Sequence, residues 1–119
     1  MQKDDLIYAG NMLDSARKGV AKTAGKTRAE YDADENLRMA LALILQNIGE
    51  AARAVSQAFR DKHPEIPWTR IVGLRHRIVH DYLNVNYEIL WGIVLNDLPP
   101  LIAQLEPIVP PEPEGPEDQ

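Results

Sequence analysis

The residues best suited to chemistry lie in one short stretch, Gly73-Leu74-Arg75-His76-Arg77-Ile78-Val79-His80-Asp81-Tyr82, here called the motif segment. Cleaving RNA without a metal requires a base for the 2′-hydroxyl, an acid for the leaving 5′-oxygen, and cations for the charge that grows on the phosphoryl oxygens. Histidine suits the first two roles because its pKa lies near neutrality, and arginine suits the third because its planar guanidinium matches phosphate oxygens. The segment therefore contains the residue types that this chemistry needs.

Helix geometry limits how these residues can meet. Arg75 and His80 are five positions apart, so an ideal helix would point them roughly 140° away from each other. They converge only if the helix unwinds near His80, or if a partner subunit supplies a second copy of the segment. Asp81 and the asparagines that follow favour unwinding.

A zinc site is the first alternative for the same residues. His76 and His80 are four apart, so one helical face could present both imidazoles to a metal. However, the position after His76 is not the Glu of an H-E-x-x-H motif, and the remaining histidine, His63, lies beyond a proline break. Arg75 and Arg77 would also repel a cation. We therefore expect no metal, and composition alone also leaves a plain surface or interface role open for the segment.

Glu50 is a candidate supporting residue. It follows Gly49, which permits a close helix contact, and from there it could orient Arg75 or His80. The alternative is an exposed carboxylate that pairs with Arg53, three residues on, and contributes little.

The apolar periodicity predicts an all-α fold, an antiparallel bundle of four to five helices. Gly25 ends a first helix that begins near Asp4, and Asp32 and Glu35 fit a capping box for a second helix that continues to Lys62. A proline-rich break at 63–67 precedes a third helix that ends around 80–83. Asn84 or Asn86 caps a fourth helix, and Asn96 or Asp97 caps a short last one that reaches about residue 106, with two prolines in its first turn. Nothing in the pattern predicts a β-hairpin.

Composition and charge are those of one globular domain, expected over residues 1–106, followed by a disordered acidic tail over 107–119. The chain has 119 residues and a net charge of −5, yet residues 1–111 carry 13 basic and 14 acidic side chains, so the tail accounts for most of the excess. The local charge of a surface guides an approaching polyanion more than the net charge of the protein does. Residues 15–29 and residues 70–80 each contain basic side chains and no acidic side chain. No apolar run is long enough to span a membrane and no signal peptide is recognisable; the absence of cysteine fits a reducing cytoplasm.

The ordered set of motifs resembles the HepT family of HEPN ribonucleases. The family signature is an Arg, a polar residue, three further positions, a His, one spacer and a Tyr, which matches Arg75, His76, His80 and Tyr82. Four further segments agree in order and spacing: Ile48-Gly49-Glu50-Ala51-Ala52, Ile66-Pro67-Trp68, Leu90-Trp91 and Asn96-Asp97-Leu98-Pro99. The resemblance covers about residues 4–106. His76 is a departure, because the family often has Asn there.

The resemblance implies a HEPN-like helical-bundle homodimer in which two copies of the motif face each other across a cleft. It implies an endoribonuclease toxin that needs no cofactor, cleaves RNA to a 2′,3′-cyclic phosphate, and is silenced when a nucleotidyltransferase antitoxin adds AMP to Tyr82. Arg75 and His80 would then be the catalytic residues, with His76, Arg77 and Glu50 supporting them. The alternative is a non-catalytic helical partner that binds and regulates a nucleotidyltransferase; a plain dimerisation module is a third possibility.

Overall fold

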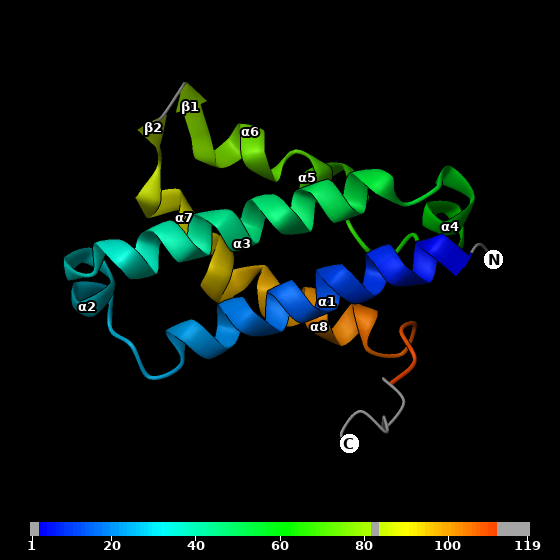
Figure 1. The fold of residues 1–119 in the computed structure, drawn as a ribbon, viewed down its shortest axis with the longest axis horizontal. Coiled ribbons are helices and arrows are strands. Elements are labelled where there is room, and N and C mark those ends of the chain that lie inside the picture. Colours follow the sequence, from blue (N-terminus) through cyan, green and yellow to red (C-terminus); the bar gives the residue numbers. More distant parts are fainter. Residues whose placement is uncertain (1–2, 82–83, 112–119) are drawn as a thin grey trace, which may run out of the picture.

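Two long antiparallel helices, α1 (Lys3–Thr23) and α3 (Glu35–Ala54), form the centre of the fold (Figure 1). The computed structural model describes residues 3–81 and 84–111. Small side chains on α1, Ala9 and Ala16, let the two helices approach closely, and the fully buried Leu41 and Leu45 of α3 fill the space between them. This pairing provides the surface on which most of the shorter helices pack.

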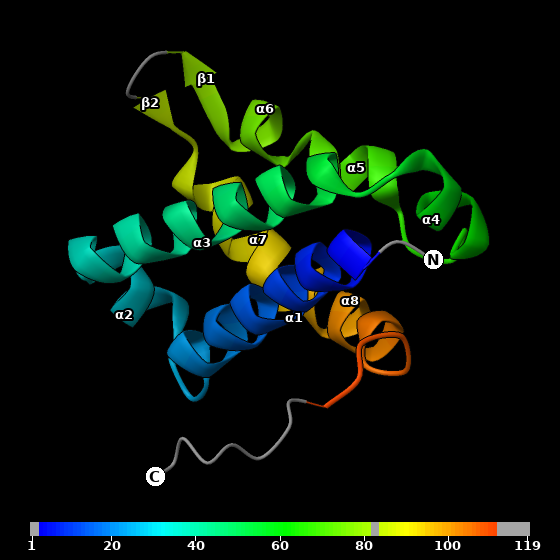
Figure 2. The same cartoon turned by 45° about the vertical axis from the view of Figure 1, so that its right-hand side comes forward.

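Shorter helices cover both sides of this pair. On the α3 side lie α5 (Trp68–Val72) and α6 (Leu74–Ile78), and on the α1 side lies α8 (Leu98–Leu105) (Figure 1). The helix α7 (Tyr87–Asn96) contacts both α1 and α3, as the turned view in Figure 2 shows. The predicted all-α bundle is therefore confirmed as the fold class.

The connection from α1 to α3 differs from the prediction. Gly25 ends the first helix with a φ of 74°, but Thr27 and Glu30 then form a reciprocal capping box for a separate short helix, α2 (Arg28–Ala33). Asp34 caps α3 by accepting a hydrogen bond from Leu37 N at 3.0 Å. The capping box predicted for Asp32 and Glu35 is therefore wrong, because Thr27 caps α2 and Asp34, which lies between the two predicted residues, caps α3.

The predicted second helix is also shorter than expected. It ends at Ala54, Val55 is extended, and Ser56 caps a new helix, α4 (Gln57–Lys62). The buried carboxylate of Asp5 accepts hydrogen bonds from Ser56 N at 2.8 Å and Ser56 Oγ at 2.7 Å. This pair of bonds ties the first turn of α1 to the break between α3 and α4, and it satisfies a carboxylate that would otherwise be buried without partners.

The third predicted helix is divided at Gly73, and beyond Ile78 the chain becomes extended. A small antiparallel hairpin follows, with strands β1 (Val79–Asp81) and β2 (Asn84–Val85), in which Val79 pairs with Val85. A hairpin was not expected; the paired β-branched residues Val79 and Val85 favour extended backbone on both strands. The last two helices agree with the prediction, since Asn86 caps α7 and Asp97 precedes α8, with prolines in its first turn.

The packed region reaches slightly past the predicted boundary at residue 106, because Ile108 and Val109 are partly buried against the core. The remainder of the predicted tail, 112–119, lies outside the described residues, so its predicted disorder stays a prediction. None of the helices in the described ranges is both long and apolar enough to cross a lipid bilayer.

Candidate active site

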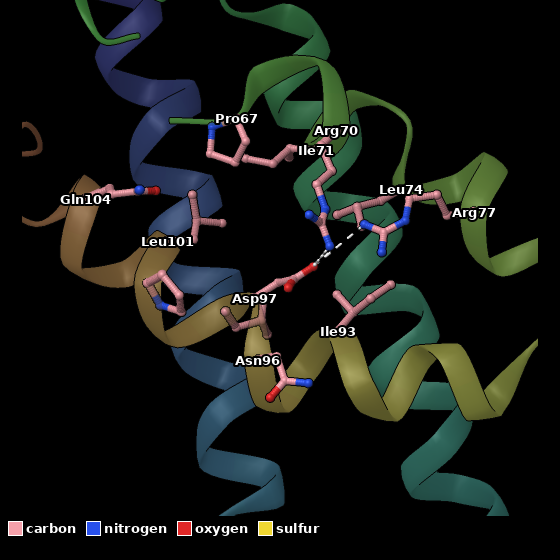
Figure 3. A pocket seen from close by; sticks show the side chains of 12 residues that line it. Pro67, Arg70, Ile71, Leu74, Arg77, Ile93, Asn96, Asp97, Leu101 and Gln104 are labelled. Atoms are coloured by element: carbon pink, nitrogen blue, oxygen red, sulfur yellow. Dashed lines mark hydrogen bonds and ion pairs between the residues drawn. The ribbon is translucent and has the colours of Figure 1, made fainter. Parts of the chain in front are cut away.

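The helix α6 presents the cations of the motif segment in different directions. Arg75 and His76 are exposed, and neither makes a hydrogen bond or ion pair with any residue that the structure describes. Arg77, two positions after Arg75, lies on the other side of the helix and is half-buried (Figure 3). The guanidinium of Arg75 and the imidazole of His76 are therefore exposed to solvent, whereas the guanidinium of Arg77 is directed toward the interior.

Gly49 fixes how closely α5, and the start of α6 that follows it, approach the central helix. A Cβ at this position would lie 3.2 Å from the carbonyl oxygen of Ile71 and 3.7 Å from Leu74 Cβ. Only a glycine allows α5 and α6 to sit this close to α3, while the buried Leu74 and Ile78 hold α6 in place. The close contact predicted for Gly49 is therefore confirmed.

The helix ends just before His80, which is one of the two conditions under which Arg75 and His80 could converge. Ile78 is the last residue of α6, and the backbone of His80 lies in β1. The base of the hairpin is fixed by Asn86 N, which donates to Ile78 O at 2.6 Å. The side chain of His80 and the whole of Tyr82 lie outside the described residues, so their predicted roles stay predictions.

Three charged side chains gather on the inner side of α6, and we call them the Asp97 cluster: Arg70, Arg77 and Asp97. Asp97 Oδ2 accepts a hydrogen bond from Arg70 Nη2 at 3.1 Å and lies 3.6 Å from Arg77 Nη1 (Figure 3). One carboxylate therefore connects α5, α6 and the junction of α7 with α8.

The sequence analysis does not predict this cluster, because it assigns Asp97 a role as a helix cap and no ion-pair partner. The structure shows no side-chain capping bond from Asp97. A signal was available, since the basic run from Arg70 to Arg77 contains no acid and needs a counter-charge from elsewhere in the chain.

Glu50 is exposed, and its Oε1 lies 4.0 Å from Arg53 Nε. Glu50 therefore makes the exposed pairing with Arg53 that the sequence offered as the alternative to a supporting role. Within the described ranges, Glu50 does not contact Arg75. The described residues contain no group of three or more His, Cys, Asp or Glu side chains that could hold a metal ion.

The second strand of the hairpin leads into α7, whose first turn is anchored by Tyr31. This side chain is fully buried, stacks on Trp91 with ring centroids 4.6 Å apart, and donates a hydrogen bond to Tyr87 O at 2.6 Å. Burial raises the pKa of Tyr31 to about 12, so the hydroxyl keeps its proton and its bond at neutral pH.

These features define a small helical-bundle protein that displays an arginine and a histidine beside a short hairpin. The chain belongs to the HepT-like ribonuclease family: the family model, "Ribonuclease HepT-like", matches residues 12–108.

Relatives of known name agree with this assignment. A protein of Methanocaldococcus jannaschii named "Putative RNase" is 32% identical over 91% of this chain and 89% of its own length. A protein of the same name from Caldanaerobacter subterraneus subsp. tengcongensis is 31% identical over 86% of this chain and 91% of its own. "Probable ribonuclease HepT" of Thermococcus cleftensis is 32% identical over 65% of this chain and 70% of its own. No solved structure matches significantly.

Proposed function

We propose that this protein is a metal-independent endoribonuclease that uses Arg75 and His80. The observation that carries the proposal is the exposed, unpaired Arg75 and His76 on α6, one turn before the helix ends and the chain extends through His80. An unpaired guanidinium beside an unpaired imidazole favours binding of a phosphodiester. Membership of the HepT-like ribonuclease family supports the same activity.

In the proposed reaction, the 2′-oxygen of one ribose attacks the adjacent phosphorus and the bond to the 5′-oxygen of the next nucleotide breaks. One titrating group takes the 2′-hydroxyl proton, and a proton is given to the leaving 5′-oxygen, so the products are a 2′,3′-cyclic phosphate and a 5′-hydroxyl. His80 serves as base or acid, with His76 as the second titrating group. Arg75 holds the phosphoryl oxygens as charge grows on them.

We place this activity in a toxin–antitoxin system of the cytoplasm. The antitoxin would be a nucleotidyltransferase that transfers AMP from ATP to Tyr82: the phenolic oxygen bonds to the α-phosphorus, pyrophosphate leaves, and the phenolic proton is released. The added phosphodiester charge would sit near Arg75 and occupy the place of a substrate phosphate. Exposed apolar side chains on α7, Ile89 and Leu95, support the homodimer through the third and fourth predicted helices.

The test is cleavage of a fluorescent RNA by the purified protein with and without EDTA. Cleavage should survive EDTA, leave a cyclic phosphate, and fall at least about a hundredfold in His80→Ala and Arg75→Ala, with helical circular dichroism retained. Arg53→Ala is the matched control, because Arg53 is similarly exposed but lies on α3, and it should cleave normally.

Two outcomes would refute this assignment. Activity that vanishes with EDTA and returns with zinc would favour a His76/His80 metal site. A folded protein that binds a nucleotidyltransferase but cleaves no RNA would favour the non-catalytic partner. For the modification, intact-mass spectrometry after incubation with ATP, magnesium and the antitoxin should show added AMP on wild type and none on Tyr82→Phe.

A further inference from the structure

A hollow of about 120 Å³ lies beside the Asp97 cluster, and neither the family assignment nor the proposed reaction gives it a role (Figure 3). It is enclosed by α5, α6, the end of α7 and the first turns of α8. Its walls are apolar, formed by Ile71, Leu74, Ile93, Leu98 and Leu101. We call it the α6–α8 hollow.

The polar groups at the hollow are both acceptors and donors. Asp97 uses Oδ2 for the two arginines, and its Oδ1 bonds to no residue that the structure describes. Gln104 Nε2 donates to Glu65 O at 3.0 Å, which fixes the amide and leaves Oε1 as an acceptor. Arg77 Nη1 is shielded from solvent and lies 3.6 Å from Asp97 Oδ2, an ion-pair distance that is too long for a hydrogen bond.

A planar heterocycle matches this combination of walls and polar groups. An apolar cavity of about 150 Å³ accommodates a benzene ring, so the open-sided hollow has the right order of size for a six-membered ring. The two acceptors suit the exocyclic amino group of a nucleobase. Arg70, which is exposed, leaves most of its N–H donors for a phosphate.

We propose that the α6–α8 hollow is a subsite for one unstacked base of the RNA substrate, and that it prefers amino-bearing bases over uracil. The inference rests on the proposed endoribonuclease function and adds base selectivity to it. Arg77 and His80 are three residues apart, so their backbones lie within about 11 Å of each other. Since a stacked strand advances about 3.4 Å per nucleotide, the bound base would belong to a nucleotide within a few positions of the cut.

The hollow could be probed directly with the four nucleoside 3′-monophosphates, using protein labelled at its isoleucine and leucine methyl groups. Methyl signals of Leu74, Ile93 and Leu101 should move, and uridine monophosphate should bind at least about fivefold more weakly than the best of the others, the effect of one hydrogen bond. Equal shifts with ribose 5-phosphate, which lacks a base, would overturn the proposal. So would shifts produced by a leucyl-aspartate peptide but by no nucleotide, since the hollow would then be a peptide-docking site.

A variant separates this inference from the function on which it rests. Gln104→Met removes the fixed acceptor at similar size, and the preference against uracil near the cut should shrink to within about twofold. Gln57→Met is the matched control, because Gln57 also has a hydrogen-bonded amide, to Asp61 Oδ1 at 2.9 Å, but lies on α4. Its cleavage pattern should equal that of wild type.

The two failures are distinguishable. If wild type cleaves RNA but Gln104→Met keeps the wild-type preference and no methyl group in the hollow responds, the subsite is wrong while the nuclease stands. If wild type cleaves no RNA, the nuclease is wrong, and the methyl titration still decides whether the hollow binds a base.

Discussion

Replacing Gly49 with alanine tests whether the approach of α5 and α6 to α3 is set by the missing side chain. In a helix interior, glycine to alanine normally stabilises a protein by about 0.8–1.0 kcal/mol. At Gly49 the new Cβ would lie 3.2 Å from the Ile71 carbonyl oxygen, which belongs to the backbone and cannot rotate away. Overpacking of this kind costs about 1–3 kcal/mol, so we expect a net destabilisation of about 1 kcal/mol.

Gly10→Ala is the matched control, because Gly10 is also inside a long helix. Its Cβ would meet only Val109 Cγ1, at 3.7 Å, an ordinary van der Waals contact. The control should gain about 0.8 kcal/mol, and urea unfolding followed by circular dichroism should separate the two variants by about 2 kcal/mol. Because the α5 backbone at Ile71 must shift by a few tenths of an ångström and α6 follows it directly, Gly49→Ala should also lose RNase activity severalfold, whereas Gly10→Ala should not. A Gly49→Ala protein as stable as the control would refute the reasoning.

Three further results are expected. Asp97→Ala should lower the free energy of unfolding by about 1–3 kcal/mol, because it leaves the half-buried Arg77 without a counter-charge; an unchanged urea midpoint would show that the cluster contributes nothing. Tyr31→Phe should cost about 1 kcal/mol at neutral pH by removing the bond to Tyr87 O. Because the pKa of Tyr31 is raised in the folded protein, its hydroxyl loses its proton at lower pH in the unfolded chain than in the folded one. The contribution of Tyr31 to the free energy of unfolding is therefore complete below about pH 10 and is lost between pH 10 and 12. The free energy of unfolding of Tyr31→Phe should not fall in this way between pH 10 and 12. If it falls equally in both proteins, Tyr31 is not the cause. Deleting residues 112–119 should leave the melting temperature unchanged, since that composition cannot bury a core; a drop of several degrees would show that they dock.

The elements that the sequence predicted well are those with strong local signals. Asn86 caps α7 with two hydrogen bonds, and the prolines after Asp97 occupy a first turn whose donors would have no helical partner. The Asn86 cap and the two prolines each act on neighbouring residues only, so they can be recognised in the sequence alone.

The breaks inside the predicted helices had weaker signals. The division after Ala54 depends on Ser56 bonding to Asp5, a residue 51 positions away. Likewise, Arg77 turns inward only because Asp97 arrives from another helix. Such partners are set by tertiary packing, and helix periodicity carries no information about them.

The packing of α8 against α1 has a consequence for biosynthesis. Leu98, Leu101 and Leu105 complete the core, and Arg17 pairs with Glu106 at 2.9 Å. Chains emerge from the ribosome N-terminus first, so α1 and α3 leave the exit tunnel with part of their apolar surface still uncovered. Residues 75–80 are also synthesised before α8, and we expect them to become fixed only when α8 docks. A partly translated chain would then lack the proposed active site and could not use it to cut the message that encodes it.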